Sequence, residues 1–397
     1  MEADPKLSFD DTEVAFSYKP DAALKKAHFI FSLVNNPLIS SLATSSVKLA
    51  LKLRLPVEGL IKKTVFDHFC GGESIDKCDD EISQLSRYGV GTILDYSVEG
   101  EKSEAGFDQT MEETLRTLEK AGKSASGVPF SVFKVTGLAS AELLEKVQRK
   151  NTLTSAEQEA FERVRTRVDR ICAKAHAVKI PVLIDAEESW IQDPIDDLAY
   201  EMMATYNREK AIVFNTFQLY RTASFQNLCE AHEAARKDGY HLGCKLVRGA
   251  YMEKERARAE ALGYPSPIQP DKDATDKAFN DALVFCMDNI DRVAIMCGSH
   301  NEHSNYQLTE LMKKGNLKNH DERVWFAQLY GMSDNISFNL AKHGYCVAKY
   351  VPYGPVRAVM PYLFRRAKEN TSVAGQSSRE LTLIRKELQR RKSKKRA

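Results

Sequence analysis

From about residue 90 onward, short apolar runs alternate with longer amphipathic stretches, and this alternation recurs eight times. The apolar runs are rich in β-branched and aromatic residues, which is typical of strands buried on both faces of a parallel sheet. We predict these strands at 92–95, 130–135, 181–185, 211–215, 244–247, 292–297, 324–329 and 345–350.

Helical patterns separate the strands, at 107–121, 156–178, 194–206, 225–238, 273–288, 304–313 and 334–342. Pro194 suits the first position of its helix, with Asp193 as the cap. No Gly-x-Gly-x-x-Gly motif follows any strand, which argues against an open dinucleotide-binding sheet. Eight strand–helix units therefore predict an α/β fold of the TIM type, a (βα)8 barrel.

Two regions flank this alternation. Residues 1–90 contain helical patterns at 20–35, 37–55 and 75–88, and we predict a helical N-terminal region. Residues 91–391 are assigned to the catalytic barrel, including a helix after the last strand that is expected over the barrel mouth. Residues 392–397 form a basic tail, and the run 390–396 is interpreted as a solvated, disordered end.

Composition narrows the class of protein. A hydrophobic share of 43% with 28% charged residues indicates a soluble globular chain, and a net charge of +2 gives no reason to expect nucleic-acid binding. The eight cysteines lack paired spacing, which suits reduced thiols. No apolar run is long enough to span a membrane, and the acidic start predicts no targeting segment. The basic amphipathic segment 47–66 leaves peripheral membrane contact open, beside packing onto its own barrel.

Polar side chains follow almost every predicted strand. The active site of a (βα)8 enzyme forms at these C-terminal strand ends, whereas a barrel built only for stability does not need polar groups there. The sequence therefore predicts an enzyme. The strand-end set is Asp95, Glu99, Lys134, Asp185, Glu187, Glu188, Asn215, Gln218, Lys245, Arg248, Tyr251, Ser299, His300, Gln328, Leu329 and Tyr350.

Segment 350–370 carries the most specific pattern in the chain. After a Pro-Tyr-Gly-Pro turn, a predicted helix places four side chains at i, i+3, i+4 and i+7, on one stripe: Tyr362, Arg365, Arg366 and Glu369. Adjacent guanidinium groups beside a phenol suit a small carboxylate ligand. For the arginine pair alone, a solvated helix face is the alternative.

This segment resembles the C-terminal signature of proline dehydrogenases, flavin enzymes that oxidise L-proline. The resemblance covers about residues 85–391 and looks closest to the monofunctional, eukaryotic-like branch. It implies a (βα)8 barrel that binds FAD non-covalently. The other matching strings are 94–99, 133–134, 183–188, 214–218, 245–251 and 298–301.

The resemblance also implies roles for individual residues. Arg365 and Arg366 would hold the substrate carboxylate, and Leu329 would bound the ring. Lys134, Asp185 and Tyr251 are the expected catalytic residues. The implied substrate contacts are Lys134, Asp185, Leu329, Tyr350, Tyr362, Arg365 and Arg366.

Flavin contacts and a gate are implied in the same way. Glu99 and Arg365 would form a gate, although a solvated loop carboxylate is an equal alternative for Glu99. Lys245 departs from the arginine that many bacterial members carry. The implied FAD contacts are Asn215, Gln218, Lys245, Arg248, Gly249, Ala250, Tyr251, Ser299, His300 and Glu369.

The implied reaction is the first step of proline catabolism. Hydride would leave proline C5 for flavin N5, giving Δ1-pyrroline-5-carboxylate, and the electrons would pass to a quinone. The expected location is a bacterial cytoplasm, with peripheral contact to the inner membrane as one alternative, or the mitochondrial inner membrane and matrix if the source is eukaryotic. Rival hypotheses are a hydroxyproline dehydrogenase, which a bulky Tyr350 disfavours, a Schiff-base lyase using Lys134, and a non-catalytic barrel. No metal site is expected, because the Cys297–His303 spacing lacks a fourth ligand.

Overall fold

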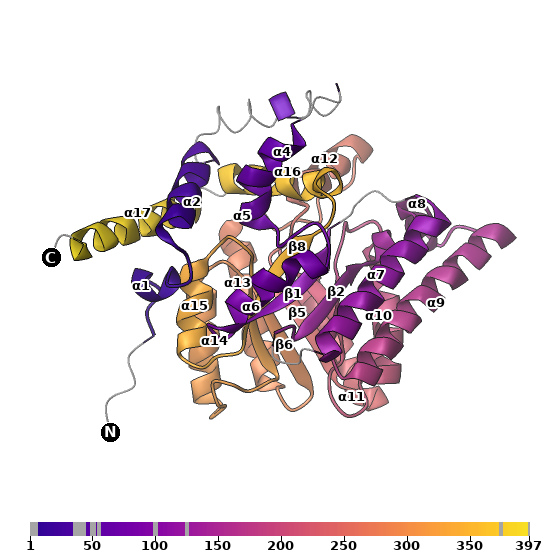
Figure 1. Ribbon diagram of the computed structural model, residues 1–397. Helices are drawn as coiled ribbons and strands as arrows, with labels where there is room; N and C mark the ends of the chain where they lie inside the picture. The colour runs from indigo at the N-terminus through magenta and orange to yellow at the C-terminus, as the bar shows by residue number, and fades with distance from the viewer. Residues whose placement is uncertain are drawn as a thin grey trace. The chain divides into compact units, whose positions relative to one another are not determined.

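Eight parallel strands follow one another around a closed barrel (Figure 1). The computed structural model describes residues 7–34, 45–47, 53, 57–97, 102–123, 127–372 and 376–395, with only the backbone at 34, 367–372 and 376–377. All eight predicted strands are present, so the (βα)8 fold is confirmed. Their bounds are β1 Val90–Tyr96, β2 Phe130–Lys134, β3 Val182–Asp185, β4 Val213–Gln218, β5 Leu242–Val247, β6 Val293–Gly298, β7 Val324–Leu329 and β8 Val347–Tyr353.

Helices connect the strands and flank the barrel sequence on both sides. In the connections and after β8 they are α7 Glu104–Lys123, α8 Ala141–Gln148, α9 Ser155–Val178, α10 Gln192–Tyr206, α11 Ser224–Asp238, α12 Met252–Leu262, α13 Lys272–Asp288, α14 Glu302–Lys314, α15 Asp334–Lys342 and α16 Val356–Ser372. At the two ends of the chain they are α1 Thr12–Ala15, α2 Asp21–Val34, α4 Glu58–Ile61, α5 Asp67–Phe69, α6 Asp79–Ser86 and α17 Gln376–Lys394.

The predicted start of α10 is wrong by two residues. The helix begins at Gln192, Ile191 occupies the cap position without a side-chain hydrogen bond, and Pro194 lies in the first turn instead of at its start. The Gln192 side chain accepts a hydrogen bond from the Glu187 backbone at 2.7 Å and so fixes the entry to the helix. Pro194 is still tolerated, because backbone N–H groups in the first turn have no intrahelical partner.

Contacts group the chain into two compact units. The central unit comprises residues 93–96 and 100–327, and the terminal unit comprises 1–92, 97–99 and 328–397. In the central unit, the ring of Phe130 meets Phe214 and Trp325 edge-on, with centroids 5.6 and 5.2 Å apart. Phe130 opens β2 and Trp325 lies near the start of β7. Aromatic packing therefore fills the N-terminal end of these strands, so the polar side chains concentrate at their C-terminal ends.

The terminal unit has its own hydrophobic cluster. Residues from α2, α16 and α17 share it, including Phe31, Val359, Leu363 and Ile384, all buried. The Val356–Ser372 helix confirms the helix predicted after β8. The predicted helix at 37–55 lies mostly outside the described residues.

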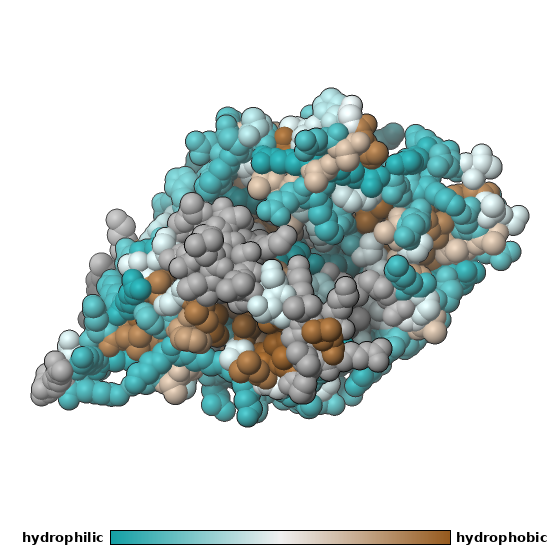
Figure 2. All heavy atoms as spheres, turned by 90° about the horizontal axis from the view of Figure 1, so that it is seen from above, coloured by the Kyte–Doolittle hydropathy of each residue, from teal (hydrophilic) through white to brown (hydrophobic). Residues whose placement is uncertain are grey.

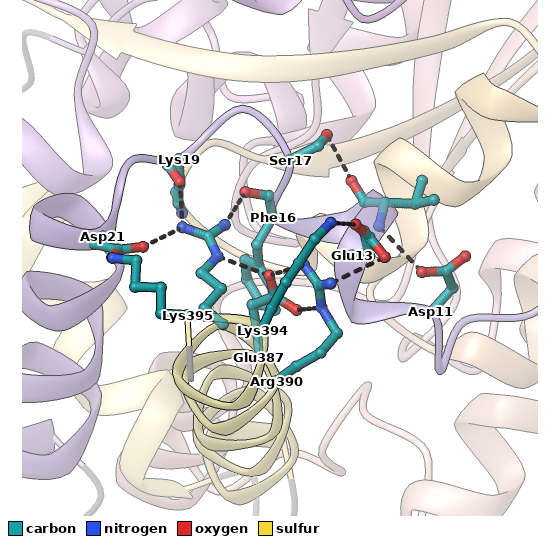
Figure 3. A network of polar contacts seen from close by, with 12 residues as sticks. Asp11, Glu13, Phe16, Ser17, Lys19, Asp21, Glu387, Arg390, Lys394 and Lys395 are labelled. Atoms are coloured by element: carbon teal, nitrogen blue, oxygen red, sulfur yellow. Dashed lines mark hydrogen bonds and ion pairs between the residues drawn. The ribbon is translucent and has the colours of Figure 1, made fainter. Parts of the chain in front are cut away.

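The basic end of the chain is folded, which overturns the expected solvated and disordered end for residues 390–395. These residues continue α17 and meet the acidic N-terminal segment (Figure 3). Arg391 donates to the carbonyl oxygens of Phe16 and Lys19, both at 2.8 Å, and to Asp21 at 3.0 Å. The partners lie more than 300 positions away, so no local pattern shows them.

Hydrophobic residues also appear at the surface among hydrophilic ones (Figure 2). Among the described residues of the N-terminal region, the exposed large apolar side chains include Phe29, Leu33, Leu53 and Leu60. Within the described ranges, none of the helices combines the length and the apolar character needed to cross a bilayer.

Candidate active site

A group of alternating charges lies at the ends of four strands in the central unit. The Nζ atom of Lys134, at the end of β2, lies 3.1 Å from Asp185 Oδ2 at the end of β3 and 3.8 Å from Asp95 Oδ1 in β1. Lys245 in β5 makes a second ion pair with Asp185. Parallel pairing of Lys134 with Asp185 in the strand register brings the first pair together. Lys134, Asp185, Lys245 and Asp95 are called the strand-end cluster below.

Burial and charge act in opposite directions on this cluster. Burial alone raises the pKa of the Asp185 carboxyl, but Lys245 and Lys134 together bring it below its ordinary value. Burial lowers the pKa of Lys245, and Asp185 opposes that shift. Asp185 is therefore a carboxylate that accepts hydrogen bonds from two amines, and it is a poor proton acceptor near neutral pH.

The loop after β3 supports the cluster through Glu187, which is buried. The Glu187 carboxylate accepts hydrogen bonds from the backbone N–H of Thr136, at 2.9 Å, and from the Thr136 hydroxyl. Burial raises the pKa of Glu187 to about 7, although both Thr136 contacts lower it. This carboxyl fixes the turn after β2, and with it the residues that follow Lys134.

The two predicted flavin contacts on β4 are engaged inside the protein. Asn215 donates to Asp196 Oδ1 at 2.7 Å and accepts from the Thr216 backbone at 2.9 Å. Gln218 donates to the Glu187 carbonyl at 2.7 Å, and its side-chain oxygen accepts from the Ala250 backbone at 3.3 Å. Gln218 therefore joins the loop after β3 to the turn after β5.

Arg248 holds the loops after β5 and β6 together. Its guanidinium contacts Asp276 at 2.6 Å, the Ser299 hydroxyl at 2.8 Å and the Ser304 hydroxyl at 3.0 Å. It also lies 4.4 Å from the ring centroid of Phe279. His300 directly follows Ser299, so Arg248 places two of the predicted flavin contacts on one anchored turn.

Gly249, Ala250 and Tyr251 form the turn that leads from β5 to α12. Gly249 has φ +137°, and a Cβ atom there would fall 2.5 Å from the Tyr220 ring. Only glycine satisfies both conditions, so the Tyr220 ring packs directly against the backbone at this point. Tyr251 is buried at the cap of α12.

The remaining predicted residues belong to the terminal unit. Tyr362, Arg365 and Arg366 lie on α16, and the Arg366 guanidinium is 5.2 Å from the Tyr362 ring centroid. Tyr350 is buried in β8, and Leu329 ends β7 and packs against the same hydrophobic cluster as Tyr362. Glu99 and the side chain of Glu369 lie outside what the structure describes.

Sequence reasoning gave no role to Asp95 or Thr136. The strand-end rule identifies Asp95 as a candidate, but only the fold shows that it shares Lys134 with Asp185. For Thr136 no signal exists, because its contact with Glu187 spans two different loops.

Comparisons with known proteins agree with these observations. The family model described as proline dehydrogenase matches residues 78–379. Proline dehydrogenase 1, mitochondrial, of Dictyostelium discoideum is 32% identical over 97% of this chain and 75% of its own length. The carbapenem antibiotics biosynthesis protein CarD of Pectobacterium carotovorum is 34% identical over 84% of this chain and 86% of its own. Human proline dehydrogenase 1, mitochondrial, is 41% identical over 60% of this chain and 40% of its own.

Among solved structures, proline utilization A (PutA) of Bdellovibrio bacteriovorus has a similar fold, with a TM-score of 0.72 at 21% identity over 94% of this chain. This chain spans 40% of that PutA chain, so the likeness concerns part of the larger protein. The family model covers three quarters of the sequence and the barrel agrees with it, so this chain belongs to the proline dehydrogenase family.

Proposed function

We propose that this chain catalyses the FAD-dependent oxidation of L-proline to Δ1-pyrroline-5-carboxylate, the first step of proline catabolism, and passes the electrons to a quinone. The observation that carries the proposal is the strand-end cluster, in which Lys134 and Lys245 share Asp185. Family membership gives this site a substrate class, and the amines of Lys134 and Lys245 are charged hydrogen-bond donors that suit an amino-acid carboxylate.

The residues after β5 fit a flavin nucleotide. Gly249 and Ala250 are small, so backbone N–H groups of this turn would suit a ring or an anionic phosphate, and Lys245 of β5 would supply a cation. The expected contacts also include Arg248, Tyr251 and His300, together with Asn215, Gln218, Ala250, Ser299 and Glu369. When bound, FAD would supply the redox chemistry by accepting hydride from proline C5 at its N5 position.

The charges of the strand-end cluster would orient the substrate and disfavour a Schiff-base reaction at Lys134. Asp185 keeps Lys134 and Lys245 in place, and its lowered pKa makes it unsuited to remove the amine proton of proline. That proton would therefore leave to solvent before the reaction. The ion pair to Asp185 also favours a charged Lys134, which disfavours the Schiff-base alternative, because a nucleophilic lysine must be neutral. Arg365 and Arg366 would hold the carboxylate, and Glu99 with Arg365 would gate the site.

The proposed setting of this activity follows from the family. Residues 1–90 would form a helical region, 91–391 the FAD-binding barrel and 392–397 a basic tail. Exposed Phe29 and Leu60, with the neighbouring basic residues, suit peripheral contact with a quinone-bearing membrane. Relatives named mitochondrial support the mitochondrial inner membrane and matrix if the source is eukaryotic, and the bacterial cytoplasm or inner-membrane face is the alternative.

The test is a visible absorption spectrum of the purified protein, followed by anaerobic addition of L-proline. We expect a flavin spectrum that L-proline bleaches, and that trans-4-hydroxy-L-proline bleaches much less. A flavin that does not respond to L-proline would remove the substrate from the proposal. A colourless protein that FAD cannot reconstitute would remove the cofactor as well.

A further inference from the structure

The turn that follows β7 is held at every position by residues distant in the sequence. Residues 330–333, called the β7 turn here, begin directly after Leu329. The Tyr330 backbone donates to the Tyr350 carbonyl at 2.8 Å, and the Tyr330 hydroxyl bonds to Glu81. Gly331 has φ +77°, and a Cβ atom there would collide with the carbonyl oxygen of His68. A residue other than glycine at position 331 would therefore disturb the turn.

The Lys349 side chain contacts this turn from the interior of the protein. Its side chain is completely buried in β8, one residue before Tyr350. Its amine contacts the carbonyl oxygen of Met332 and lies 3.4 Å from that of Leu329. It also lies 2.9 Å from Asp334 Oδ1. A charged amine with these partners fixes the backbone on both sides of the turn.

Asp334 connects the turn to the N-terminal segment. Its other oxygen accepts from Tyr18 at 2.8 Å and from Lys19 at 2.7 Å. Lys19, Asp334 and Lys349 together are called the Asp334 cluster.

The C-terminal helix reaches the same turn. Glu380 of α17, also buried, accepts a hydrogen bond from the backbone N–H of Ser333. Ser333 has φ +50°, an uncommon conformation for a residue with a side chain, so this bond compensates for local strain. The helix therefore holds the turn directly, through Glu380.

From these contacts we infer that Lys349 and Glu380 are positioning residues, which set the substrate specificity of the site by fixing Leu329 and Tyr350. The inference rests on the proposed function, together with the substrate contacts that the family resemblance implies for Leu329 and Tyr350. It assigns the C-terminal helix α17 a role in substrate recognition, although neither Lys349 nor Glu380 touches the substrate.

The test compares buried glutamates on one helix. Glu380→Ala removes the acceptor for Ser333, whereas Glu380→Gln keeps an acceptor oxygen. Glu387→Ala is the matched control, because Glu387 is equally buried on α17 but binds Arg390 and Arg391 instead of the turn. Lys349→Met removes the amine that contacts the Met332 carbonyl, and so tests the second contact that holds the turn. The readouts are KM and kcat for L-proline, and Kd for tetrahydrofuran-2-carboxylate, an unreactive ring acid of similar size.

We expect Glu380→Ala and Lys349→Met to raise both KM and Kd by about tenfold with a smaller change in kcat, because the ring walls are displaced. Glu380→Gln should restore both constants to within about twofold, and Glu387→Ala should lower Tm without changing them. Unchanged KM and Kd in Glu380→Ala, beside an active wild type, overturn this inference alone. A wild type that neither oxidises L-proline nor binds the acid overturns the proposed function and this inference with it.

Discussion

Two groups of buried charges in this molecule both consist of lysine–aspartate ion pairs, but the two groups differ in exposure. In the strand-end cluster, the side chains of Lys134 and Asp185 keep 22% and 14% of their accessible surface. In the Asp334 cluster, Lys349 and Asp334 keep 0% and 2%, although Lys19 keeps 12%, more than the 7% of Lys245 in the strand-end cluster. The first group lies at the ends of strands where a (βα)8 enzyme binds its substrate, and the second ties β8 and α15 to the N-terminal segment.

We expect this difference in burial to separate charges that bind a ligand from charges that stabilise the fold. A sealed ion pair cannot be compensated by solvent, so loss of one partner leaves an uncompensated charge in a low dielectric. A partly exposed pair can rearrange with water, so its loss costs less stability and more function. Matched substitutions in the two clusters should therefore differ in how much stability they cost.

Asp334→Ala should have the largest effect on stability. It leaves Lys19 and Lys349 without their shared carboxylate, and we expect a loss of about 3–5 kcal/mol in the free energy of unfolding, measured by urea denaturation. Asp67→Ala is the control, because Asp67 is 45% exposed and its pair with Lys26 spans 3.5 Å. That control should change stability by less than about 1 kcal/mol. Equal losses of stability in the two variants would show that burial does not distinguish the Asp334 cluster from an exposed ion pair.

Lys134→Met should show the opposite pattern, with a large effect on turnover. We expect kcat/KM for L-proline to fall about 100-fold, roughly 2.7 kcal/mol, while Tm changes little, because Lys134 is partly exposed. Lys254→Met removes another ion pair, to Glu188 at 2.7 Å, from a lysine 63% exposed on α12. Near-normal kinetics in Lys134→Met would exclude the strand-end cluster from the substrate site.

The strand-end cluster could be anticipated from sequence and the Asp334 cluster could not. Strand ends meet at one edge of a barrel, so predicting the strands also predicts that Lys134 approaches Asp185, 51 residues away. No such rule relates Lys19 to Asp334, which are 315 residues apart and belong to a loop and a helix start. In regular secondary structure, the local sequence largely determines where a side chain lies. Contacts between irregular segments depend instead on how the whole chain packs.

The errors at helix ends have the same origin. Asp193 and Pro194 fit a helix start by local chemistry, but the Gln192 side chain, bonded to Glu187 across the loop, sets an earlier start. In α17 the local pattern of repeated cations suggested a solvated end, and distant acids changed the outcome. The helical stripe of Tyr362, Arg365 and Arg366 was predictable because it requires only helical periodicity.

Glu187→Gln tests a buried carboxyl next to the strand-end cluster through the pH dependence of stability. The folded pKa of Glu187 is raised to about 7 by burial, above the ordinary 4.5, so the folded state holds this proton more tightly than the unfolded state. Its contribution to stability therefore falls as pH rises from about 4.5 to about 7. A neutral glutamine removes this dependence, and we expect the variant to gain stability relative to wild type by about 1–3 kcal/mol between pH 5 and pH 8.

The measurement is a set of urea unfolding curves at several pH values. Lys134 and Glu188 also act on this carboxyl, so their unchanged presence in both proteins keeps the difference specific to Glu187. A stability difference that is constant from pH 5 to pH 8 would show that Glu187 is ionised throughout.

Of these variants, Tyr350→Ser should have the smallest effect on free energy. Its effect should be on the preference between two substrates. Tyr350 is buried in β8 beside Lys349, and a bulky phenol there is expected to leave little space for a ring hydroxyl. Serine should shift the ratio of kcat/KM values from L-proline toward trans-4-hydroxy-L-proline by about three- to tenfold, in line with modest steric discrimination.

The matched control for this change is Tyr345→Ser, which removes another buried tyrosine just before β8 begins, whereas Tyr350 lies at the middle of the strand. Both variants create a cavity and should lose stability, so stability alone does not distinguish them. Only Tyr350→Ser should move the substrate ratio. If both variants move it, general loosening of β8 explains the change. If neither does, substrate preference is set outside this strand, and the sealed Asp334 cluster serves the fold alone.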